Sequence, residues 1–506
     1  MAAAIRKLAG DTVWYGISSI LSRMISYFMV PLYTAVLEVR DYGIVTELYA
    51  YIAFFLVVYT YGMETTYFRY ATKGHEESIT FNVSFSTILT SSLAFSGLLC
   101  LFSTSIVNWL QYPGQEEAIY YMAGIITIDA LVSIPYARLR LQNRAKYFAY
   151  IKLTQVTVTL LLNVFFLLVC YPIAKGELFV GWQSAITFWF DANFVVKYVF
   201  MANLLANGLI LLLLLKEFYG YRFTLRLKEL KPMLIYSMPL LFMGLAAVTN
   251  EMFSRTLLKR WLPIGYYENL DNQEALAVFG AVYKLSIFIQ LGIQAFRYAA
   301  EPFFFSKTSD KSSPKLFSQV MTLFVQFNAV LFLAISVNLD WLGTMILRNE
   351  TYLTGLHIVP YLLLGYLFSG VYYNLSVWYK VSDKTHFGAI ITTIGAIITV
   401  FLNYVLIPIW GYFGSAVTTL AVFFGMSAIS YVLGQKHHPI PYDLMAIFEA
   451  ILLACVLVVI SEWVACDLSA VQFLIKNSLP ILLLIYLYLR NRKYLQGRKI
   501  LGIKMP

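Results

Sequence analysis

Charged residues are scarce in this chain: of its 506 residues only 13% are Asp, Glu, Lys or Arg, whereas 60% are hydrophobic. A soluble protein carries about 25% charged residues. The composition therefore excludes a soluble globular protein and predicts an all-α polytopic protein of the lipid bilayer. The formal net charge of +10 is explained by basic loops at an anionic membrane surface, and it requires no nucleic acid partner.

Cysteine and histidine are also rare. The four cysteines and five histidines are dispersed, without CxxC or HExxH spacing and without a carboxylate–histidine cluster. We therefore expect no metal site, no cofactor and no enzymatic activity. The N-terminal sequence has no small-residue cleavage site after a short apolar core, so we expect the first apolar segment to remain as a span.

Long apolar runs are abundant, and about fourteen of them could each cross a hydrocarbon core about 30 Å thick as a helix. Most of the 37 lysines and arginines fall in segments expected on the same side as the N-terminus. This bias predicts an even number of spans with both termini in the cytoplasm. The expected spans are 12–36, 43–66, 80–103, 116–137, 148–171, 192–215, 233–256, 276–298, 316–338, 353–375, 387–408, 413–434, 443–465 and 471–489.

The chain also repeats itself. The segment YGIVTEL begins at Tyr42 and FGAVYKL begins at Phe279, while Asn163 and Asn403 lie at matching places in the fifth and eleventh spans. These landmarks predict two parallel six-helix lobes, related by an axis along the membrane normal and arranged around a central cavity, plus two C-terminal helices. The predicted divisions are an N-lobe at 1–215, a basic cytoplasmic loop at 216–232, a C-lobe at 233–434, and the last two helices with a basic tail at 435–506.

Arg23 lies about ten residues from either end of the first expected span, roughly 15 Å deep in the membrane. A cation at that depth costs about 2.5–3.5 kcal/mol unless it faces a wet cavity or a paired partner. No carboxylate lies within one helical turn of Arg23 in the sequence. We therefore favour a substrate-binding role in the cavity over a structural one.

Other ionisable residues inside spans are candidates for the same reason. Lys284, Arg255 and Arg297 extend the substrate-binding set, and Arg297 lies near the expected inner mouth. Asp129 and Glu251 are candidates for coupling transport to an ion, although a structural, hydrogen-bonded aspartate is an equal alternative for Asp129. Glu251 and Arg255 are four residues apart on one helix face, which favours a structural pair for these two.

Two charges stand at equivalent positions of the repeats. Glu47 follows Gly43 by four residues, and Lys284 follows Gly280 by four. Opposite charges at related positions predict an outer gate, in which Glu47 and Lys284 pair when the transporter is closed at its outer mouth and separate when it opens.

Three stretches resemble a known family, the bacterial polysaccharide flippases. These flippases belong to the multidrug/oligosaccharidyl-lipid/polysaccharide exporter superfamily, which also contains the lipid II flippase. The N-terminal stretch is the most specific, and the third carries Asn403, Pro408, Gly411 and Gly414. The stretches are WYGISSILSRMISYFMVPLYTAVLEVRDYGIVTEL, FGAVYKLSIFIQLGIQAFRYAAEPFFF and LNYVLIPIWGYFGSAVTTL.

The resemblance implies two six-helix lobes, sometimes with two further helices, and alternating access. It implies movement of an undecaprenyl-pyrophosphate-linked oligosaccharide, such as an O-antigen or capsule precursor, from the inner to the outer leaflet of the bacterial cytoplasmic membrane. Na⁺ or H⁺ is the expected coupling ion. In the lipid II branch a helix 1 arginine is implicated in holding the pyrophosphate, and the resemblance gives Arg23 that role.

Two other functions compete with the flippase. A multidrug or organic-cation antiporter of the same superfamily would need a buried carboxylate in an apolar cavity rather than a surplus of cations. A membrane polysaccharide polymerase, which is an enzyme, would need a long outer loop with catalytic residues. The longest expected outer loops, 172–191 and 257–275, hold no such constellation. The flippase is therefore the favoured interpretation.

Overall fold

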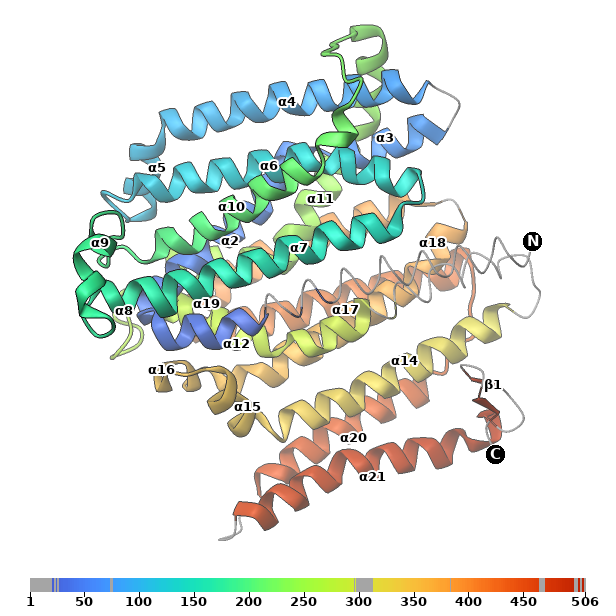
Figure 1. The fold of residues 1–506 in the computed structure, drawn as a ribbon. Helices are drawn as coiled ribbons and strands as arrows, with labels where there is room; N and C mark the ends of the chain where they lie inside the picture. The colour runs from blue at the N-terminus through green and yellow to red at the C-terminus, as the bar shows by residue number, and fades with distance from the viewer. Residues whose placement is uncertain are drawn as a thin grey trace. The chain divides into compact units, whose positions relative to one another are not determined.

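The structure is a computed structural model that describes residues 21, 24, 27–72, 76–294, 296, 313–382, 384–463, 469–495, 499–500 and 503–504. These residues are almost entirely helical, with one short antiparallel pair formed by β1 (Lys499–Ile500) and β2 (Ile503–Lys504) (Figure 1). The chain divides into two compact units. Unit 1 comprises Met1–Ala281 and Thr392–Ser415, and unit 2 comprises Val282–Ile391 and Ala416–Pro506.

The helices confirm an integral, all-α membrane protein. Among the described residues, 11 helices are long and apolar enough to cross a membrane, or up to 12 if the bent pair Asn272–Leu285 and Ile287–Gln294 forms one span. A shorter apolar helix, Tyr27–Val36, lies in the first expected span. The expected number of fourteen is not confirmed over these residues.

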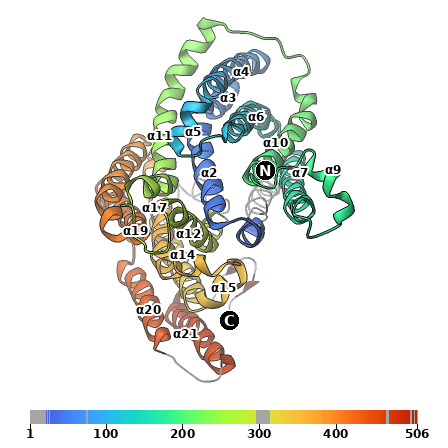
Figure 2. The ribbon, with the colours of Figure 1, turned by 90° about the vertical axis from the view of Figure 1, so that its left-hand side faces the viewer.

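In unit 1, α6 is the central helix. It contacts α2, α3, α4, α5, α7 and α10, while α11 packs along α2 and α3 (Figure 2). The helices of this unit are Tyr27–Val36, α2 (Val39–Thr60), α3 (Met63–Thr72), α4 (Glu77–Leu101), α5 (Ser103–Leu110), α6 (Glu116–Leu141), α7 (Ala145–Val164), the π-helix η1 (Phe165–Cys170), α8 (Tyr171–Ala174), the 3₁₀ turn η2 (Val180–Trp182), α9 (Gln183–Thr187), α10 (Val196–Leu213), the 3₁₀ turn η3 (Leu215–Phe218), α11 (Leu227–Trp261), most of α12 (Asn272–Leu285) and part of α19 (His386–His437).

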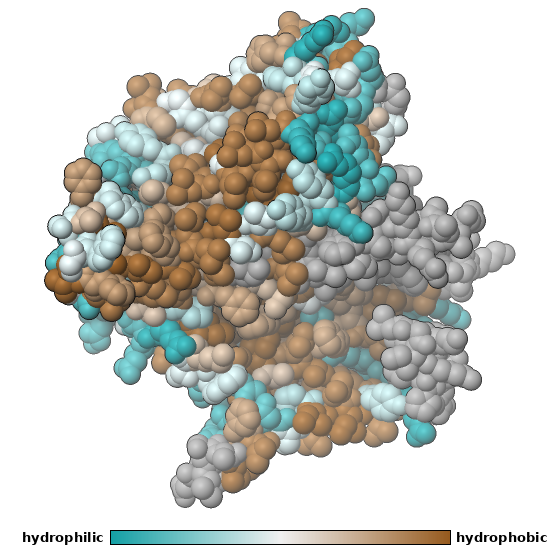
Figure 3. Space-filling model, in the orientation of Figure 1, coloured by the Kyte–Doolittle hydropathy of each residue, from teal (hydrophilic) through white to brown (hydrophobic). Residues whose placement is uncertain are grey.

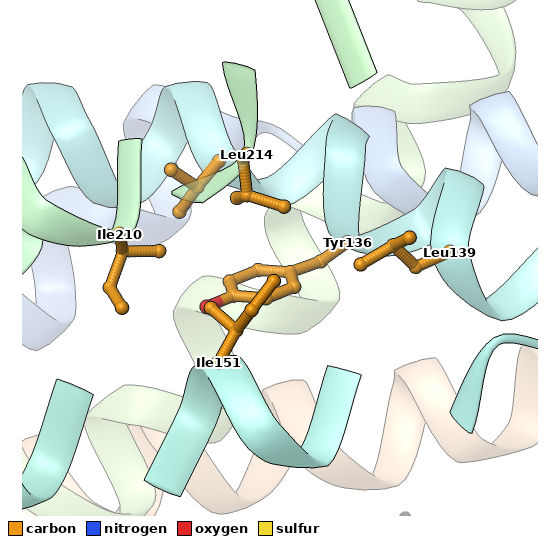
Figure 4. Close-up of a cluster of buried hydrophobic side chains, with 6 residues drawn as sticks. Tyr136, Leu139, Ile151, Ile210 and Leu214 are labelled. Atoms are coloured by element: carbon orange, nitrogen blue, oxygen red, sulfur yellow. The ribbon is translucent and has the colours of Figure 1, made fainter. Parts of the chain in front are cut away.

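The core between α6, α7 and α10 follows from helical spacing. Tyr136 and Leu139 are three residues apart on α6, and Leu214, which caps the end of α10, follows Ile210 by four, so each pair shares one face. Figure 4 shows Ile151 of α7 beside the ring of Tyr136, with the other three side chains around that ring. All five are at most 6% exposed. The outward faces of α7 and α10 are apolar as well, as expected for lipid contact, and Figure 3 shows a hydrophobic surface over this part of unit 1.

Positive-φ residues set two of the breaks between helices. Gly62 (φ 73°) follows Tyr61 (φ 33°) and separates α2 from α3. Gly411 (φ 57°, ψ −138°) breaks α19 between the two spans expected at 387–408 and 413–434. A Cβ atom at Gly411 would overlap the Tyr267 hydroxyl, so this break requires glycine both for its backbone angles and for its neighbour.

Unit 2 is built around α14, which packs against α17, α20 and α21. Asn338 and Asn477 exchange side-chain hydrogen bonds at 2.9 and 3.0 Å, which ties the end of α14 to α21. The last expected span, 471–489, contains Pro480 and is nevertheless part of the continuous helix α21. The helices of this unit are the end of α12, Ile287–Gln294, α14 (Ser313–Ser336), α15 (Leu339–Ile346), α16 (Glu350–Leu353), the 3₁₀ turn η4 (Leu356–Ile358), α17 (Val359–Leu375), α18 (Val377–Val381), the two ends of α19, α20 (Leu444–Glu462) and α21 (Ser469–Leu495).

Candidate functional site

A buried ion pair lies near one end of the unit 1 helices. Glu47 of α2 is fully buried, and Lys259 of α11 is 8% exposed. The Nζ atom of Lys259 lies 3.0 Å from Oε2 of Glu47 and also donates to the Leu110 carbonyl oxygen at 2.6 Å. Both charges have therefore exchanged water for protein partners. Such a pair holds two helices together only while its geometry is kept.

Two further side chains complete what we call the Glu47 cluster, which consists of Glu47, Tyr112, Lys259 and Gln273. The Tyr112 hydroxyl donates to Glu47 and lies 2.8 Å from Oε1 of Gln273 in α12. Burial, together with the Glu47 carboxylate, raises the pKa of the Tyr112 hydroxyl, so this group remains a proton donor. The Lys259 ammonium lies 4.0 Å from the centre of the Tyr112 ring. The cluster thus joins α2, α11, α12 and the segment that follows α5.

The glycines of the repeated segments bring α2 and α12 together at this cluster. A Cβ atom at Gly43 would lie 2.5 Å from the backbone oxygen of Gln273, and one at Gly280 would lie 2.5 Å from Cγ2 of Thr46. Real Cβ atoms do not approach other atoms so closely, so both positions need glycine for the helices to meet. The matching sequence positions therefore serve the same purpose, which is close contact between helices.

A second set of charges gathers at the other end of the unit 1 helices. Arg138 of α6 lies 3.0 Å from the Glu77 carboxylate of α4, and Arg144 lies 2.6 Å from Glu217 of η3. Arg140 also pairs with Glu64 of α3. These arginines belong to the basic segments that the sequence predicts to be cytoplasmic. Each of these arginines has a carboxylate partner. The ion pairs therefore hold helix ends together, and the same arginines also contribute to the excess of positive charge expected on the cytoplasmic side.

Asp129 lies in a polar network between α6, α7 and α10. Asn207 donates to its Oδ1 atom at 2.9 Å, and Gln155 donates to Oδ1 of Asn207 at 2.5 Å. Lys152 donates to Oε1 of Gln155 at 3.4 Å and lies 4.5 Å from the centre of the Tyr136 ring. A carboxylate and an amine thus share one hydrogen-bonded chain inside the helix bundle. The chain can hold either a structural aspartate or one that changes its protonation.

The landmark asparagines make matching contacts. Asn163 donates to the Thr159 carbonyl oxygen at 2.8 Å, and Asn403 donates to that of Thr399 at 2.8 Å. Asn163 also accepts a hydrogen bond from Tyr33, which lies in the helix Tyr27–Val36. Asn403 in turn donates to Ser254 of α11 at 3.0 Å. These contacts support a repeat in which the first and seventh expected spans have equivalent roles, while the predicted lobe boundaries stay a prediction.

The predicted site residues are distributed as follows. Arg23 and Arg297 lie outside the described residues, so their roles stay predictions. Arg255 is buried in α11 and Glu251 is half-buried one turn earlier, as expected for two residues on one face. Lys284 is half-buried in the part of α12 that belongs to unit 2, whereas Glu47 belongs to unit 1. The Glu47–Lys284 gate stays a prediction, and the carboxylate of Glu47 contacts Lys259 in this structure.

Sequence reasoning missed Lys259, Tyr112 and Gln273. Lys259 falls within 257–275, which the sequence predicts to be an outer loop. It nevertheless lies eight residues after Glu251 and four after Arg255, and this spacing places it on the same face of a long helix. That spacing was the available signal. Nothing comparable marks Tyr112, which belongs to a connection between helices.

Comparison with known proteins identifies a family and a fold. A sequence model of the family described as "Polysaccharide biosynthesis protein" matches residues 8–308, which is more than half of the chain. A comparison with curated proteins finds no match.

Solved structures share the fold. The lipid II flippase MurJ in an inward closed conformation superposes with a TM-score of 0.73 at 14% identity, over 96% of this chain and 100% of that one. An inward-facing multidrug resistance MATE family transporter of the MOP superfamily gives 0.54 at 13% identity, over 85% of this chain and 93% of that one. A MATE structure in the bent conformation gives 0.56 at 12% identity, over 89% and 99%. Because the family model matches residues 8–308, the chain belongs to the polysaccharide biosynthesis protein family, as the resemblance of its N-terminal stretch predicted.

Proposed function

We propose that this protein is a flippase that moves an undecaprenyl-pyrophosphate-linked oligosaccharide from the inner to the outer leaflet of the bacterial cytoplasmic membrane. Family membership supports a substrate in polysaccharide biosynthesis. One of the solved structures with the same fold is named as a lipid II flippase, which supports a lipid-linked substrate. The protein moves its substrate across the bilayer and does not change its bonds, so it acts as a transporter and not as an enzyme.

The observation that best supports a transport mechanism is the buried ion pair of the Glu47 cluster. This pair closes the contact between α2 and α11, and that contact must open if substrate is to leave at this end. Two paired charges suit a reversible closure because water can solvate both when they separate. Alternating access follows if the cluster is broken in one state and formed in the other.

We place the Glu47 cluster at the outer face and the Arg138, Arg140 and Arg144 network at the cytoplasmic face. The lysines and arginines gather with the second set, and positive charge marks the cytoplasmic side. Both termini are then cytoplasmic. In this orientation a chain with its Glu47 cluster formed is closed to the outside.

The pyrophosphate requires cations within the transport path. Arg23, Arg255, Lys284 and Arg297 take this role in the proposal, since guanidinium and ammonium groups form charge-assisted hydrogen bonds with phosphate oxygens. Asp129 and Glu251 are the proposed groups for coupling to Na⁺ or H⁺. The network of Asp129, Asn207, Gln155 and Lys152 supports Asp129, because a proton or ion taken up there would reorganise contacts among three helices.

A multidrug or organic-cation antiporter is the second candidate, and the shared MATE fold favours it. Its cation substrate would need a carboxylate that is free to bind it. The one fully buried glutamate of unit 1 among the described residues, Glu47, is neutralised by Lys259. Glu47 is therefore not free to bind such a substrate, whereas the family match favours a substrate of polysaccharide biosynthesis.

Deletion of the encoding gene tests the proposal. The flippase predicts that cells accumulate polyprenyl-pyrophosphate-linked glycan on the cytoplasmic side and lose the surface polysaccharide, and that the intact gene reverses both effects. Unchanged lipid-linked glycan together with increased sensitivity to cationic drugs would instead establish the antiporter.

A further inference from the structure

A pocket of about 760 Å³ lies beside the Glu47 cluster in unit 1. Its walls come from the start of α2 (Arg40), the segment after α5 (Tyr112), the end of α11 (Lys259 and Arg260) and the loop from α11 to α12. Small-molecule sites typically occupy about 300–1,000 Å³ and combine aromatic walls with a few placed polar groups. The volume is therefore sufficient for a ligand of that class.

The lining chemistry fits a sugar better than the other parts of a lipid-linked glycan. Trp109 is 58% exposed, and the Arg260 guanidinium lies 3.4 Å from the centre of its ring. An exposed indole can stack against the C–H face of a pyranose, and the adjacent guanidinium can donate to ring hydroxyls. Glu268 and Asp271 supply acceptors in the same pocket. The wall also carries cations, which balance these carboxylates. A polyhydroxyl ring uses both the donors and the acceptors, whereas a pyrophosphate would use the cations alone and an acyl chain would leave all these groups unpaired.

The loop that forms one wall is held in place before any ligand binds. Asn272 donates to the carbonyl oxygens of Lys259 and Leu262 at 3.1 and 2.7 Å. Asp271 and Glu274 cap the start of α12 reciprocally, with bonds of 2.7 and 2.8 Å. Tyr267 stacks on Tyr412 at 4.7 Å. A preformed wall lowers the ordering cost of binding.

The pocket and the Glu47 cluster share side chains. Tyr112, Lys259 and Gln273 belong to both. The side chain of Gln273 is buried, and its Nε2 atom has no hydrogen-bond partner. The single proton of the Tyr112 hydroxyl is donated to Glu47, so the Gln273 amide is better satisfied when turned with its nitrogen toward Tyr112. In either orientation one polar amide atom of Gln273 is left without a hydrogen-bond partner in this structure.

From these features we propose that the pocket is an exit-side binding site for the sugar moiety of the lipid-linked glycan. The site rests on the proposed flippase function and on the outer placement of the Glu47 cluster. A sugar in the pocket gives Lys259 and Gln273 new partners when the ion pair separates. Glycan binding therefore favours the outward-open state and releases the substrate on the outer side.

The test uses the oligosaccharide itself. Mild acid releases the soluble glycan from the polyprenyl-pyrophosphate lipid that accumulates in cells lacking this gene. The purified full-length chain in nanodiscs carries Ile264→Cys, a position in the pocket wall that is 99% exposed, and is labelled with a hydrophilic maleimide. Phe188→Cys, at a position 91% exposed and not in the pocket wall, is the matched control. The unsubstituted chain gives the labelling of the native cysteines.

Saturating glycan is expected to slow labelling at position 264 at least threefold and to leave position 188 unchanged. Trp109→Ala and Glu268→Ala should each abolish or weaken this protection. Trp182→Ala, which removes another exposed tryptophan, one that lies outside the pocket wall, should not. Glu268 is exposed and lies in a loop, so its substitution tests the site without disturbing a helix.

Equal labelling with and without glycan would overturn the site, as would protection that survives both pocket substitutions. If the lipid-linked glycan accumulates in the deletion strain but gives no protection, only the pocket inference fails. If no lipid-linked glycan accumulates, the proposed function fails and the inference fails with it.

Discussion

Glu47 of α2 and Lys259 of α11 are both buried. Burial costs each charge its hydration energy, and the attraction between the two charges offsets that cost only while α2 and α11 stay in contact. Leu110 accepts a further hydrogen bond from Lys259, and Tyr112 donates one to Glu47. Removing one partner of such a pair leaves an uncompensated buried charge, whereas replacing both removes the desolvation cost as well. The pair can therefore be tested by a double-mutant cycle.

Glu47→Gln is expected to destabilise the purified chain by about 3–5 kcal/mol because Lys259 loses its counter-charge. Adding Lys259→Met should recover a large part of that loss. Thermal unfolding in detergent measures both. Arg40→Ala is the control, since Arg40 and Asp271 are 3.9 Å apart and 63% and 47% exposed, and such a pair contributes about 0–1 kcal/mol. Equal costs for Glu47→Gln and Arg40→Ala would contradict the role of the buried pair.

Arg23→Ala is expected to abolish transport while the protein still inserts, because the cavity loses its deepest anchor for pyrophosphate. Arg23→Lys should restore activity only partly, since lysine cannot form the bidentate fork of a guanidinium. Complementation of the deletion strain, with protein levels measured in the membrane, checks both variants. Normal polysaccharide export by Arg23→Ala would remove Arg23 from substrate binding.

Asp129→Asn is expected to keep the fold, because an amide can still take part in the hydrogen bonds around Asn207. It cannot bind a proton or carry a negative charge, so transport should lose its dependence on the ion gradient. Transport assayed with and without imposed H⁺ and Na⁺ gradients distinguishes the two roles. Full gradient dependence in the variant would leave Asp129 with a structural role alone.

At the scale of helices, glycine decides where α2 and α12 touch. Gly43 faces backbone and Gly280 faces the Thr46 side chain, so the two close approaches differ in what can move aside. A backbone atom can give way only if the helices separate, whereas a side chain can be shortened by substitution. Asn163 and Asn403 also lie at matching places in the sequence, and each donates to the carbonyl oxygen four residues earlier.

Gly43→Ala and Gly280→Ala are each expected to lower stability by about 1–3 kcal/mol through overpacking. Thr46→Ala should relieve Gly280→Ala, because it removes the atom that the new methyl group meets, and it should not relieve Gly43→Ala. Gly208→Ala in α10 is the control, since no atom lies within 4 Å of the position of its Cβ. Thermal unfolding of the five variants checks this pattern, which fails if Gly208→Ala is as costly as the other two glycine substitutions.

At the scale of the whole molecule, composition and hydropathy were sufficient to predict the class of protein. Scarce charge and long apolar runs predict a helical membrane protein, and the break at Gly411 was visible from its Pro408–Gly411–Gly414 setting. The number of spans was less secure, because helices such as α11 run beyond the apolar window, from Leu227 to Trp261. Helix ends depend on caps and tertiary contacts that hydropathy does not contain.

The site was harder to predict for a physical reason. Glu47 was identified from its place in the repeat, but its contact Lys259 is more than two hundred positions away, and Tyr112 belongs to a connection without periodicity. Side-chain pairing across helices depends on how the helices rotate about their axes. A single sequence gives depth and helix face but not that rotation.

Leaflet exchange in proteoliposomes tests the central claim most directly. The purified chain is reconstituted with the polyprenyl-pyrophosphate-linked glycan isolated from the deletion strain, and the glycan exposed on the outer leaflet is measured over time under H⁺ or Na⁺ gradients. The flippase predicts exchange that requires the chain, responds to one of the gradients and is lost in Arg23→Ala. A correctly folded chain that leaves the glycan in its original leaflet under every gradient, while exporting an organic cation, would contradict the account.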